Sequence, residues 1–511
     1  MNLGLKTGLL GTAAALALTV ASVPAYAQDD LSALRQQLET MKERLAKLEA
    51  DKADKRRVAA AAAVEAGDKP RSWKLPGTNT SMNIGGFVKM SVLWDFGNSG
   101  QTTGTSTTEG IGAGFHAVDG SVADNTFNGG NFQFTARRSR IWFQTWTPTD
   151  WGELRTYIEA DFAGSGAAAG PSTNVLRLRQ AYGTLGPVLI GKTQTLFGGL
   201  IGLPELLHDG APMALGALRI EQIRYSHNFG GGLVLSVALE SPHSTSDAAP
   251  NDFRIGVCGD NPQCNNNQFS SLAGTQFNNT AGVEGPARWP DVVAALQWNF
   301  PNGALYGSGM IGQRFIDTGG GATAVLNVNP ATNRNDSDII WGAALGARYD
   351  FGRVEVGFNG GVGRGIGNKY FDGGATGLQN GVIIINNGPG MNVPGGATNP
   401  HDASLRGALV YGALGYVQVK LTDTIRATAA YNWTQNNMAN EVPGYYNAGA
   451  TSSKSVLTGA VNYYWAAFGN LLWNPVPQVT FGAEYGYQYA ARYNSNDTHV
   501  HRLQLAAIYR F

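Results

Sequence analysis

The sequence predicts an all-β transmembrane β-barrel of about sixteen antiparallel strands, preceded by a short α-helical coiled-coil segment. Three observations support this: apolar and polar residues alternate from about residue 83 onward, short turns alternate with long loops, and the chain ends on an aromatic strand residue in "HVHRLQLAAIYRF". Glycine makes up 69 of 511 residues, as expected for a chain rich in turns and loops.

Residues 1–27 have the three regions of a secretory signal peptide: Lys6, the apolar run "GLLGTAAALALTVASV" and the small-x-small site "AYA" at 25–27. A buried helix is the alternative. No later segment has about 20 consecutive apolar residues, so no transmembrane helix is expected. A secreted barrel is expected in the outer membrane of a Gram-negative bacterium, in contact with lipid and lipopolysaccharide.

Residues 28–55 predict a periplasmic coiled-coil helix that trimerises the chain. Apolar residues at spacings of 3 and 4 form an a/d stripe: Leu31, Leu34, Leu38, Met41, Leu45 and Leu48. Three heptads are marginal alone, so copies of the same helix are the simplest partners. The alternative is a single amphipathic helix lying on the barrel or on peptidoglycan. Residues 56–82 are expected to form a linker and joint.

Residues 83–511 predict the barrel itself. Seven short joins are recognised: "TPTDWG", "LGP", "FGGG", "FPNG", "DFGR", "LTDT" and "WNPVP". Long loops rich in glycine and asparagine separate them, which is the asymmetry of outer-membrane barrels. In "GELRTYIEADF" the apolar side chains share one face, and Glu153, Arg155, Tyr157, Glu159 and Asp161 share the other. Lipid cannot contact the charged face, so that face is expected to line an aqueous channel. Phe511 would close the last strand and act as a signal to the barrel-assembly machinery.

The segment 196–216, "LFGGLIGLPELLHDGAPMALG", is unusually apolar for a loop of this chain. An apolar loop should be buried, so we predict that it folds into the barrel and narrows the pore, with Glu205, His208 and Asp209 at the constriction. The alternative is a loop that covers the trimer interface.

Basic residues gather on the second, fourth and sixth predicted strands and next to them. Alternation places several on the lumenal face, and the predicted pore set is Arg138, Arg140, Arg155, Arg177, Arg179, Lys192 and Arg219, opposed by Glu159, Asp161, Glu205 and Asp209. Arginine stays charged and binds carboxylates in bidentate fashion. This pattern favours a transverse field that selects small organic anions, particularly dicarboxylates. The alternative is that the arginines only pair with neighbouring carboxylates and make the wall rigid.

Cys258 and Cys264 occur in "CGDNPQC" and predict a small disulfide loop, since the periplasm is oxidising. A metal pair is the alternative, but no further ligand completes a zinc set. Basic and acidic residues are equal at 37 each, which argues against a nucleic-acid partner. No hydrolase or zinc motif is present, so we expect no enzymatic activity, no metal and no cofactor.

The stretch "SWKLPGTNTSMNIGGFVKMSVLWDF" (72–96) joins a helical leader to a first strand through "LPGT". It resembles the DcaP-like family of trimeric outer-membrane porins. The resemblance implies a homotrimer with a periplasmic coiled coil that admits small organic anions. The combined hypothesis is a passive porin; the alternative is a structural protein that tethers the outer membrane to the cell wall through its N-terminal helix.

Overall fold

The computed structural model describes residues 26–61, 65–96, 131–164, 175–208, 214–215, 218–242, 253–257, 288–317, 335–372, 378, 381–387, 401–441, 461–493 and 497–511. The chain divides into two units, Met1–Ala66 and Gly67–Phe511. Cys258, Cys264 and Asp209 lie outside the described residues, as does the side chain of Leu31. None of the described helices is long and apolar enough to cross a membrane.

The first unit contains one helix, α1 (Tyr26–Ala61), of 36 residues. At about 1.5 Å per residue it extends over roughly 54 Å. The a/d side chains that the structure describes are all exposed in the single chain, from 54% for Leu38 to 68% for Met41. Five large apolar side chains at heptad spacing therefore have no cover within their own unit.

The second unit is built from an 18-stranded sheet. Its strands are β1 (Trp73–Lys74), β2 (Ser81–Phe96), β3 (Asn131–Thr135), β4 (Arg140–Thr149), β5 (Gly152–Gly164), β6 (Val175–Leu185), β7 (Val188–Gln194), β8 (Arg219–Gly230), β9 (Leu233–Glu240), β11 (Asp291–Phe300), β12 (Gly303–Asp317), β13 (Asn335–Asp350), β14 (Val354–Arg364), β17 (Leu409–Lys420), β18 (Ile425–Asn436), β19 (Val461–Val476), β20 (Val479–Arg492) and β21 (Thr498–Arg510).

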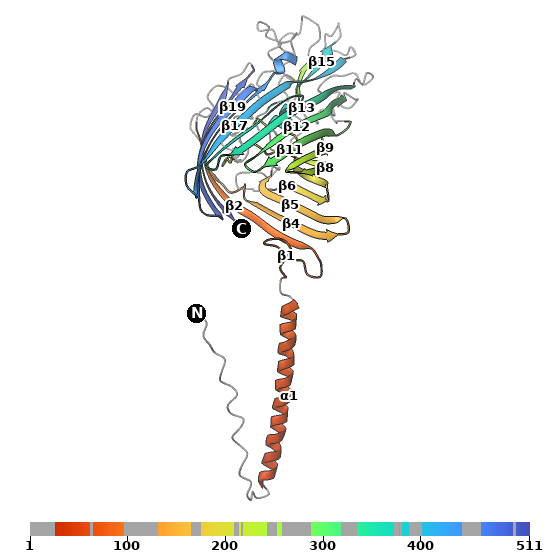
Figure 1. Ribbon diagram of the computed structural model, residues 1–511, viewed down its shortest axis with the longest axis vertical. Helices are drawn as coiled ribbons and strands as arrows, with labels where there is room; N and C mark the ends of the chain where they lie inside the picture. The colour runs from red at the N-terminus through yellow and green to blue at the C-terminus, as the bar shows by residue number, and fades with distance from the viewer. Residues whose placement is uncertain are drawn as a thin grey trace, which may run out of the picture. The chain divides into compact units, whose positions relative to one another are not determined.

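The sheet closes into an antiparallel barrel of 16 strands, as predicted. β1 adds only two residues to the edge of β2, and β3 and β4 pair with the two halves of β2 as one interrupted strand. Closure occurs where β21 pairs with β2 from Phe87↔Arg510 to Phe96↔His501. Figure 1 shows the C-terminus beside β2. All seven predicted short joins coincide with tight connections between consecutive strands.

Phe511 extends the closure by one residue. Its N–H donates to the carbonyl of Gly86 at 3.1 Å, and its carbonyl accepts from the Gly86 N–H at 3.3 Å. A Cβ at position 86 would come within 2.4 Å of the Arg140 carbonyl oxygen and 2.6 Å of the Phe511 ring. Glycine at this position therefore makes room for the terminal aromatic ring.

Large apolar side chains on alternate strand positions point away from the barrel. Examples are Trp94, Phe134, Leu178, Leu345 and Leu505, which are 46–64% exposed. The intervening positions face the inside and include many buried polar and charged groups. Water-facing charge inside and apolar surface outside are the reverse of a soluble sheet protein, and they define a membrane barrel.

Elements between strands fill part of the interior at the end with the long loops. The π-helix η2 (Gly367–Asp372) follows β14, and η3 (Met438–Glu441) follows β18. A second sheet combines β10 (Phe253–Val257), β15 (Gly381–Asn387) and β16 (His401–Gly407), with β10 parallel to β15.

Candidate pore and its constriction

The inner face of β4–β6 carries a compact basic cluster. Asp161 is fully buried at its centre and accepts from Arg177 at 2.9 and 2.6 Å and from Arg179 at 2.6 Å. Glu159 accepts from Arg179 at 2.8 Å and lies 3.3 Å from Arg140. Arg138 is 4.0 Å from Asp161. Four arginines therefore surround two carboxylates, which leaves a local positive excess among the described residues.

A bulge in β6 brings two of these arginines together. The register of β5 with β6 runs Glu159↔Gln180 and then Ala160↔Leu178, so Arg179 is the extra residue. Such bulges redirect a side chain and bend the strand. Here the bulge lets Arg179 reach both carboxylates while Arg177 keeps its own pair with Asp161.

Arg155 lies nearer the short-turn end of the same inner face. Its Nη2 donates to the neutral amide oxygen of Gln144 at 3.0 Å, and its guanidinium lies 5.9 Å from the centre of the Tyr157 ring. Among the described residues it has no carboxylate partner, so its charge is not compensated locally. Tyr157 in turn donates to Glu159 at 2.9 Å.

The loop after β7 begins inside the barrel. Glu240 on β9 accepts from the Leu196 N–H at 2.7 Å and from the Thr195 hydroxyl at 2.8 and 3.0 Å. Phe197 is 1% exposed, and its ring lies 5.0 Å from that of Tyr370. Loop residues share one buried cluster with β12, β13, β17 and β19 side chains. The loop therefore packs on the inner wall.

Hydrogen bonds hold the next part of the loop to β14. The Nδ2 of Asn359 donates to the carbonyls of Gly198 and Ile201, both at 2.9 Å. Gly202 has a φ of +79°, and a Cβ there would lie 1.9 Å from the Phe358 carbonyl oxygen. Only glycine permits this conformation and this close approach of two backbones.

The loop then reaches β18–β21 and β2. Glu205 binds Arg426 at 2.5 and 2.6 Å. Glu484 accepts from the N–H groups of Leu207 at 2.7 Å and His208 at 2.9 Å. The ammonium of Lys89 donates to the Leu207 carbonyl at 2.8 Å.

His208 completes this anchor. Its Nε2 lies 2.6 Å from the Nη1 of Arg502, which pairs with Asp95 at 2.6 and 2.7 Å. The segment 195–208 thus crosses the interior from β7 to the wall formed by β14, β18–β21 and β2. Leu200 on this segment remains 54% exposed.

Among the described residues, the predicted opposing poles are not found as such. Glu159 and Asp161 lie within the arginine cluster, because β5 and β6 are adjacent and their register pairs both carboxylates with the β6 arginines. Glu205 is paired with Arg426. Arg137 instead donates to the Phe162 and Gly164 carbonyls from the break between β3 and β4.

Lys192 does not belong to the pore, contrary to the prediction. It pairs in register with Glu221 and alternates with Ile190 on the outer side of the barrel, where Ile190 is 59% exposed. Its ammonium lies 3.1 Å from the Glu221 carboxylate. Arg219, the first residue of β8, is partly buried and close enough to Arg140, Arg177 and Arg179 to interact with their charges.

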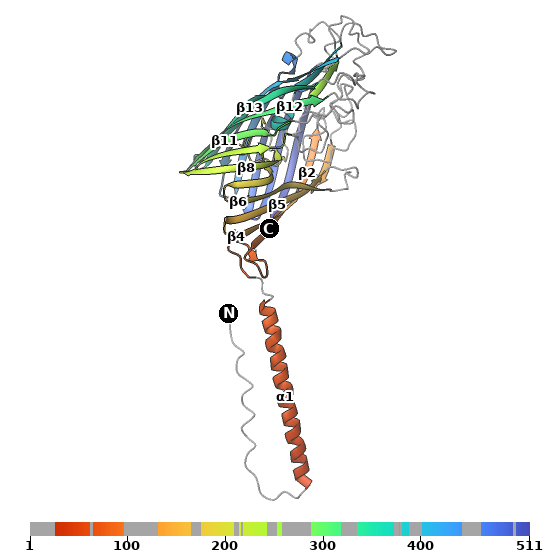
Figure 2. The same cartoon turned by 90° about the vertical axis from the view of Figure 1, so that its right-hand side faces the viewer.

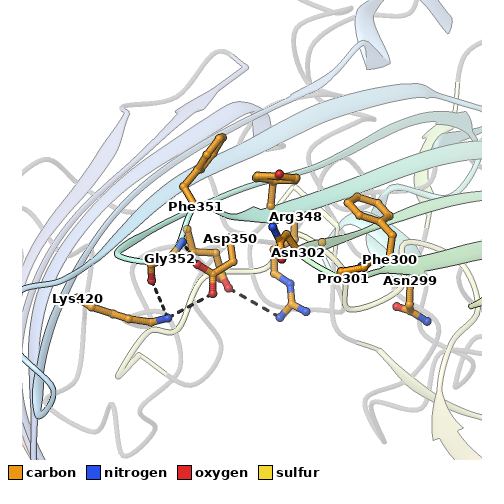
Figure 3. Close-up of a pocket in the computed structure, with 12 residues that line it drawn as sticks. Asn299, Phe300, Pro301, Asn302, Arg348, Asp350, Phe351, Gly352 and Lys420 are labelled. Atoms are coloured by element: carbon orange, nitrogen blue, oxygen red, sulfur yellow. Dashed lines mark hydrogen bonds and ion pairs between the residues drawn. The ribbon is translucent and has the colours of Figure 1, made fainter.

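Two further polar sites lie beside this pathway. Lys369 of η2 is fully buried against Asp291 at 2.8 Å, and burial lowers the pKa of its ammonium. At the short-turn end, a polar pocket shown in Figure 3 lies between the β11–β12 and β13–β14 turns. Arg348 and Lys420 line it together with Asp350 and Glu355. Lys420 donates to Asp350 at 3.3 Å and to the Gly352 carbonyl at 3.0 Å.

A closed barrel with an apolar outer surface, a charged inner wall and an inward loop defines an outer-membrane channel protein. The family model of the porin subfamily matches residues 73–506, and the chain belongs to that family. This family and fold belong to the Gram-negative outer membrane, and they point to a channel rather than an enzyme.

Three solved structures are similar to this chain to different degrees. The outer-membrane channel DcaP of Acinetobacter baumannii has 17% identity and a TM-score of 0.59, covering 87% of this chain and all of that one, which confirms the DcaP-like resemblance at the level of fold. OmpT of Vibrio cholerae, solved as a trimer, has 10% identity and a TM-score of 0.44 over 84% of this chain and 99% of that one. An anion-selective porin from Comamonas acidovorans has 8% identity and a TM-score of 0.44, covering 84% of this chain and all of that one. No curated protein matches the sequence.

Proposed function

We propose that this porin is a passive diffusion channel that prefers small organic anions such as dicarboxylates. The observation that carries the proposal is the arginine-rich inner face of β4–β6. Arg177 retains 35% side-chain exposure while it binds Asp161, and Arg155 has a neutral partner. These two guanidinium groups are therefore available to a carboxylate in the lumen.

The two buried carboxylates support this proposal. Asp161 and Glu159 are 0% and 5% exposed, whereas the side chain of Arg177, which binds Asp161, is 35% exposed. A passing anion meets guanidinium groups first and the carboxylates only beneath them. Pairing with acidic residues and anion preference are therefore compatible, because the carboxylates orient the arginines and only partly cancel their charge.

We also propose that the porin is a homotrimer, assembled in part through a periplasmic coiled coil. Residues 28–55 would form its trimerisation segment after removal of a signal peptide (1–27), and residues 56–82 would join it to the barrel. The uncovered stripe from Leu34 to Leu48 supports self-association. Phe511 would be the residue recognised by the barrel-assembly machinery, and lipopolysaccharide the lipid of the outer leaflet. The Cys258–Cys264 disulfide remains a prediction.

The test is single-channel recording of the purified full chain in planar bilayers under a salt gradient. Anion-selective reversal potentials, with conductance reduced by millimolar dicarboxylate but not by a monovalent amine, are expected. Cation selectivity would reject the anion preference and keep the porin. Absence of conductance would favour the tether alternative, in which the N-terminal helix binds the cell wall.

A further inference from the structure

The outer wall of β6–β8 carries an ion pair where a lipid-facing barrel should be apolar. Lys192 and Glu221 are register partners on β7 and β8, with their charged atoms 3.1 Å apart and Glu221 55% exposed. The same face carries Ile190 and Ile223, at 59% and 53% exposure, which establishes that it points outward.

The pair lies at the level of the hydrocarbon region. Lys192 comes five residues after Pro187 in the β6–β7 turn, and Glu221 comes ten before Gly231 in the β8–β9 turn. With a rise of about 3.3 Å per residue and a tilt near 45°, Lys192 is roughly 12 Å and Glu221 roughly 23 Å above its own turn, inside an apolar band of about 25 Å. Exposed charge is unfavourable at that depth.

The barrel wall is also low at β7. β7 has seven residues, and both of its ends are described: Gly186 and Pro187 form the preceding turn, and Thr195 already turns into the lumen. Seven tilted residues rise only about 16–18 Å, less than the band that lipid requires. By contrast, β13 and β19 have 16 residues each. Figure 2 shows β4, β5, β6 and β8 side by side on one flank.

Small side chains lie beside the ion pair on the outward face. Ala181 pairs with Lys192, and Gly183 pairs with Ile190, so small side chains continue the outward face of β6. On the adjacent strands the outward hydroxyls of Thr145 and Thr156 bond each other at 2.7 Å. An outward face with small residues and satisfied polar pairs suits close contact with another protein surface better than contact with lipid chains.

We propose that the outer face of β5–β8, centred on Gly183, Lys192 and Glu221, is the barrel-to-barrel interface with a second copy of this chain. The inference rests on the proposed homotrimer and adds where its barrels meet. A second copy is the occupant because its own Lys192 and Glu221 supply both signs of charge to the contact, and because association through α1 brings copies of the same barrel together in the same membrane.

Gly183 offers a variant that fills the face without disturbing the barrel. A Cβ there would have the Arg155 carbonyl oxygen at 3.8 Å as its only neighbour within 4 Å among the described atoms. The matched control is Gly469 on β19, where a Cβ would meet nothing within 4 Å and whose register partner Tyr485 also faces outward. We would compare Gly183→Trp with Gly469→Trp in the full chain.

Light scattering in mild detergent gives the oligomer mass, and heat-modifiable migration shows that each barrel is folded. Wild type and Gly469→Trp should be oligomeric, whereas Gly183→Trp should lose at least nine-tenths of the oligomer while remaining folded. Lys192→Glu places two carboxylates together and should also reduce the fraction of oligomer. If Gly183→Trp keeps the wild-type oligomer while deletion of residues 29–52 abolishes it, this interface is overturned and the homotrimer remains. A folded monomeric wild type would overturn both.

Discussion

Neutralising Arg155 tests the basic-wall hypothesis most directly, because its described partner is the neutral amide of Gln144. Removing this charge does not release a carboxylate that would complicate the result. Arg155→Gln removes the charge and keeps a polar side chain of similar reach, while Arg155→Lys keeps the charge and loses the guanidinium fork.

The expected magnitude follows from Coulomb's law. One unit charge about 6 Å from a passing ion contributes about 0.7 kcal/mol in water, and ionic screening near 0.1 M reduces this to about 0.35 kcal/mol. That energy changes the local concentration of each ion about 1.8-fold, in opposite directions for anion and cation. The ratio of anion to cation permeability should therefore fall about threefold in Arg155→Gln.

The assay is the reversal potential of single channels under a tenfold salt gradient, measured at low and high ionic strength. Arg155→Lys should retain the wild-type ratio, and the effect of Arg155→Gln should shrink as salt increases. A ratio in Arg155→Gln within 1.3-fold of wild type at low salt would refute the claim that lumenal charge on this wall sets selectivity.

Three other perturbations follow from the contacts. Glu484→Ala leaves the Leu207 and His208 N–H groups without their acceptor, which costs about 1–3 kcal/mol for each group. The loop should therefore become sensitive to protease, and the single-channel current should become noisier. The control is Gln488→Ala, on the same face and without described hydrogen bonds. In Gly86→Val the new side chain should collide with Phe511 and reduce the stability of the barrel by about 1–3 kcal/mol, which a lower melting temperature would show. Deletion of Phe511 should impair assembly into the membrane. Leu38→Asp with Leu45→Asp should dissociate the oligomer, measured by its mass, while single-channel conductance persists; dissociation with loss of conductance would contradict this.

The strand pattern could be predicted from sequence because it depends on local chemistry. A period of two fixes which side chains share a face, and joins such as "FPNG" contain residues that only turns favour. The same rule could have excluded Lys192 from the pore, since Val188, Ile190 and Lys192 alternate on one face.

The anchors of the inward loop could not be predicted in the same way. Glu484 and Arg502 are more than 270 residues from Leu207 and His208 in the chain, and they meet them only because the barrel closes. In the sequences of their own strands, Glu484 and Arg502 look like any other polar residue that faces the inside of the barrel. The bulge at Arg179 was equally hidden, because alternation already placed this side chain inward and gave no sign of an extra residue.

The anchoring of the loop determines what the arginines can do. Asn359, Glu484 and Lys89 fix the segment 195–208 to β14, β20 and β2, and the arginine cluster belongs to β4–β6. These described anchors of the loop lie on strands other than those that carry the arginine cluster. Arg426 pairs with Glu205, so this loop carboxylate is not an uncompensated acidic pole. Under the proposed anion preference, such a pore would orient a dicarboxylate by attraction at the arginine wall, without requiring an acidic pole across from it.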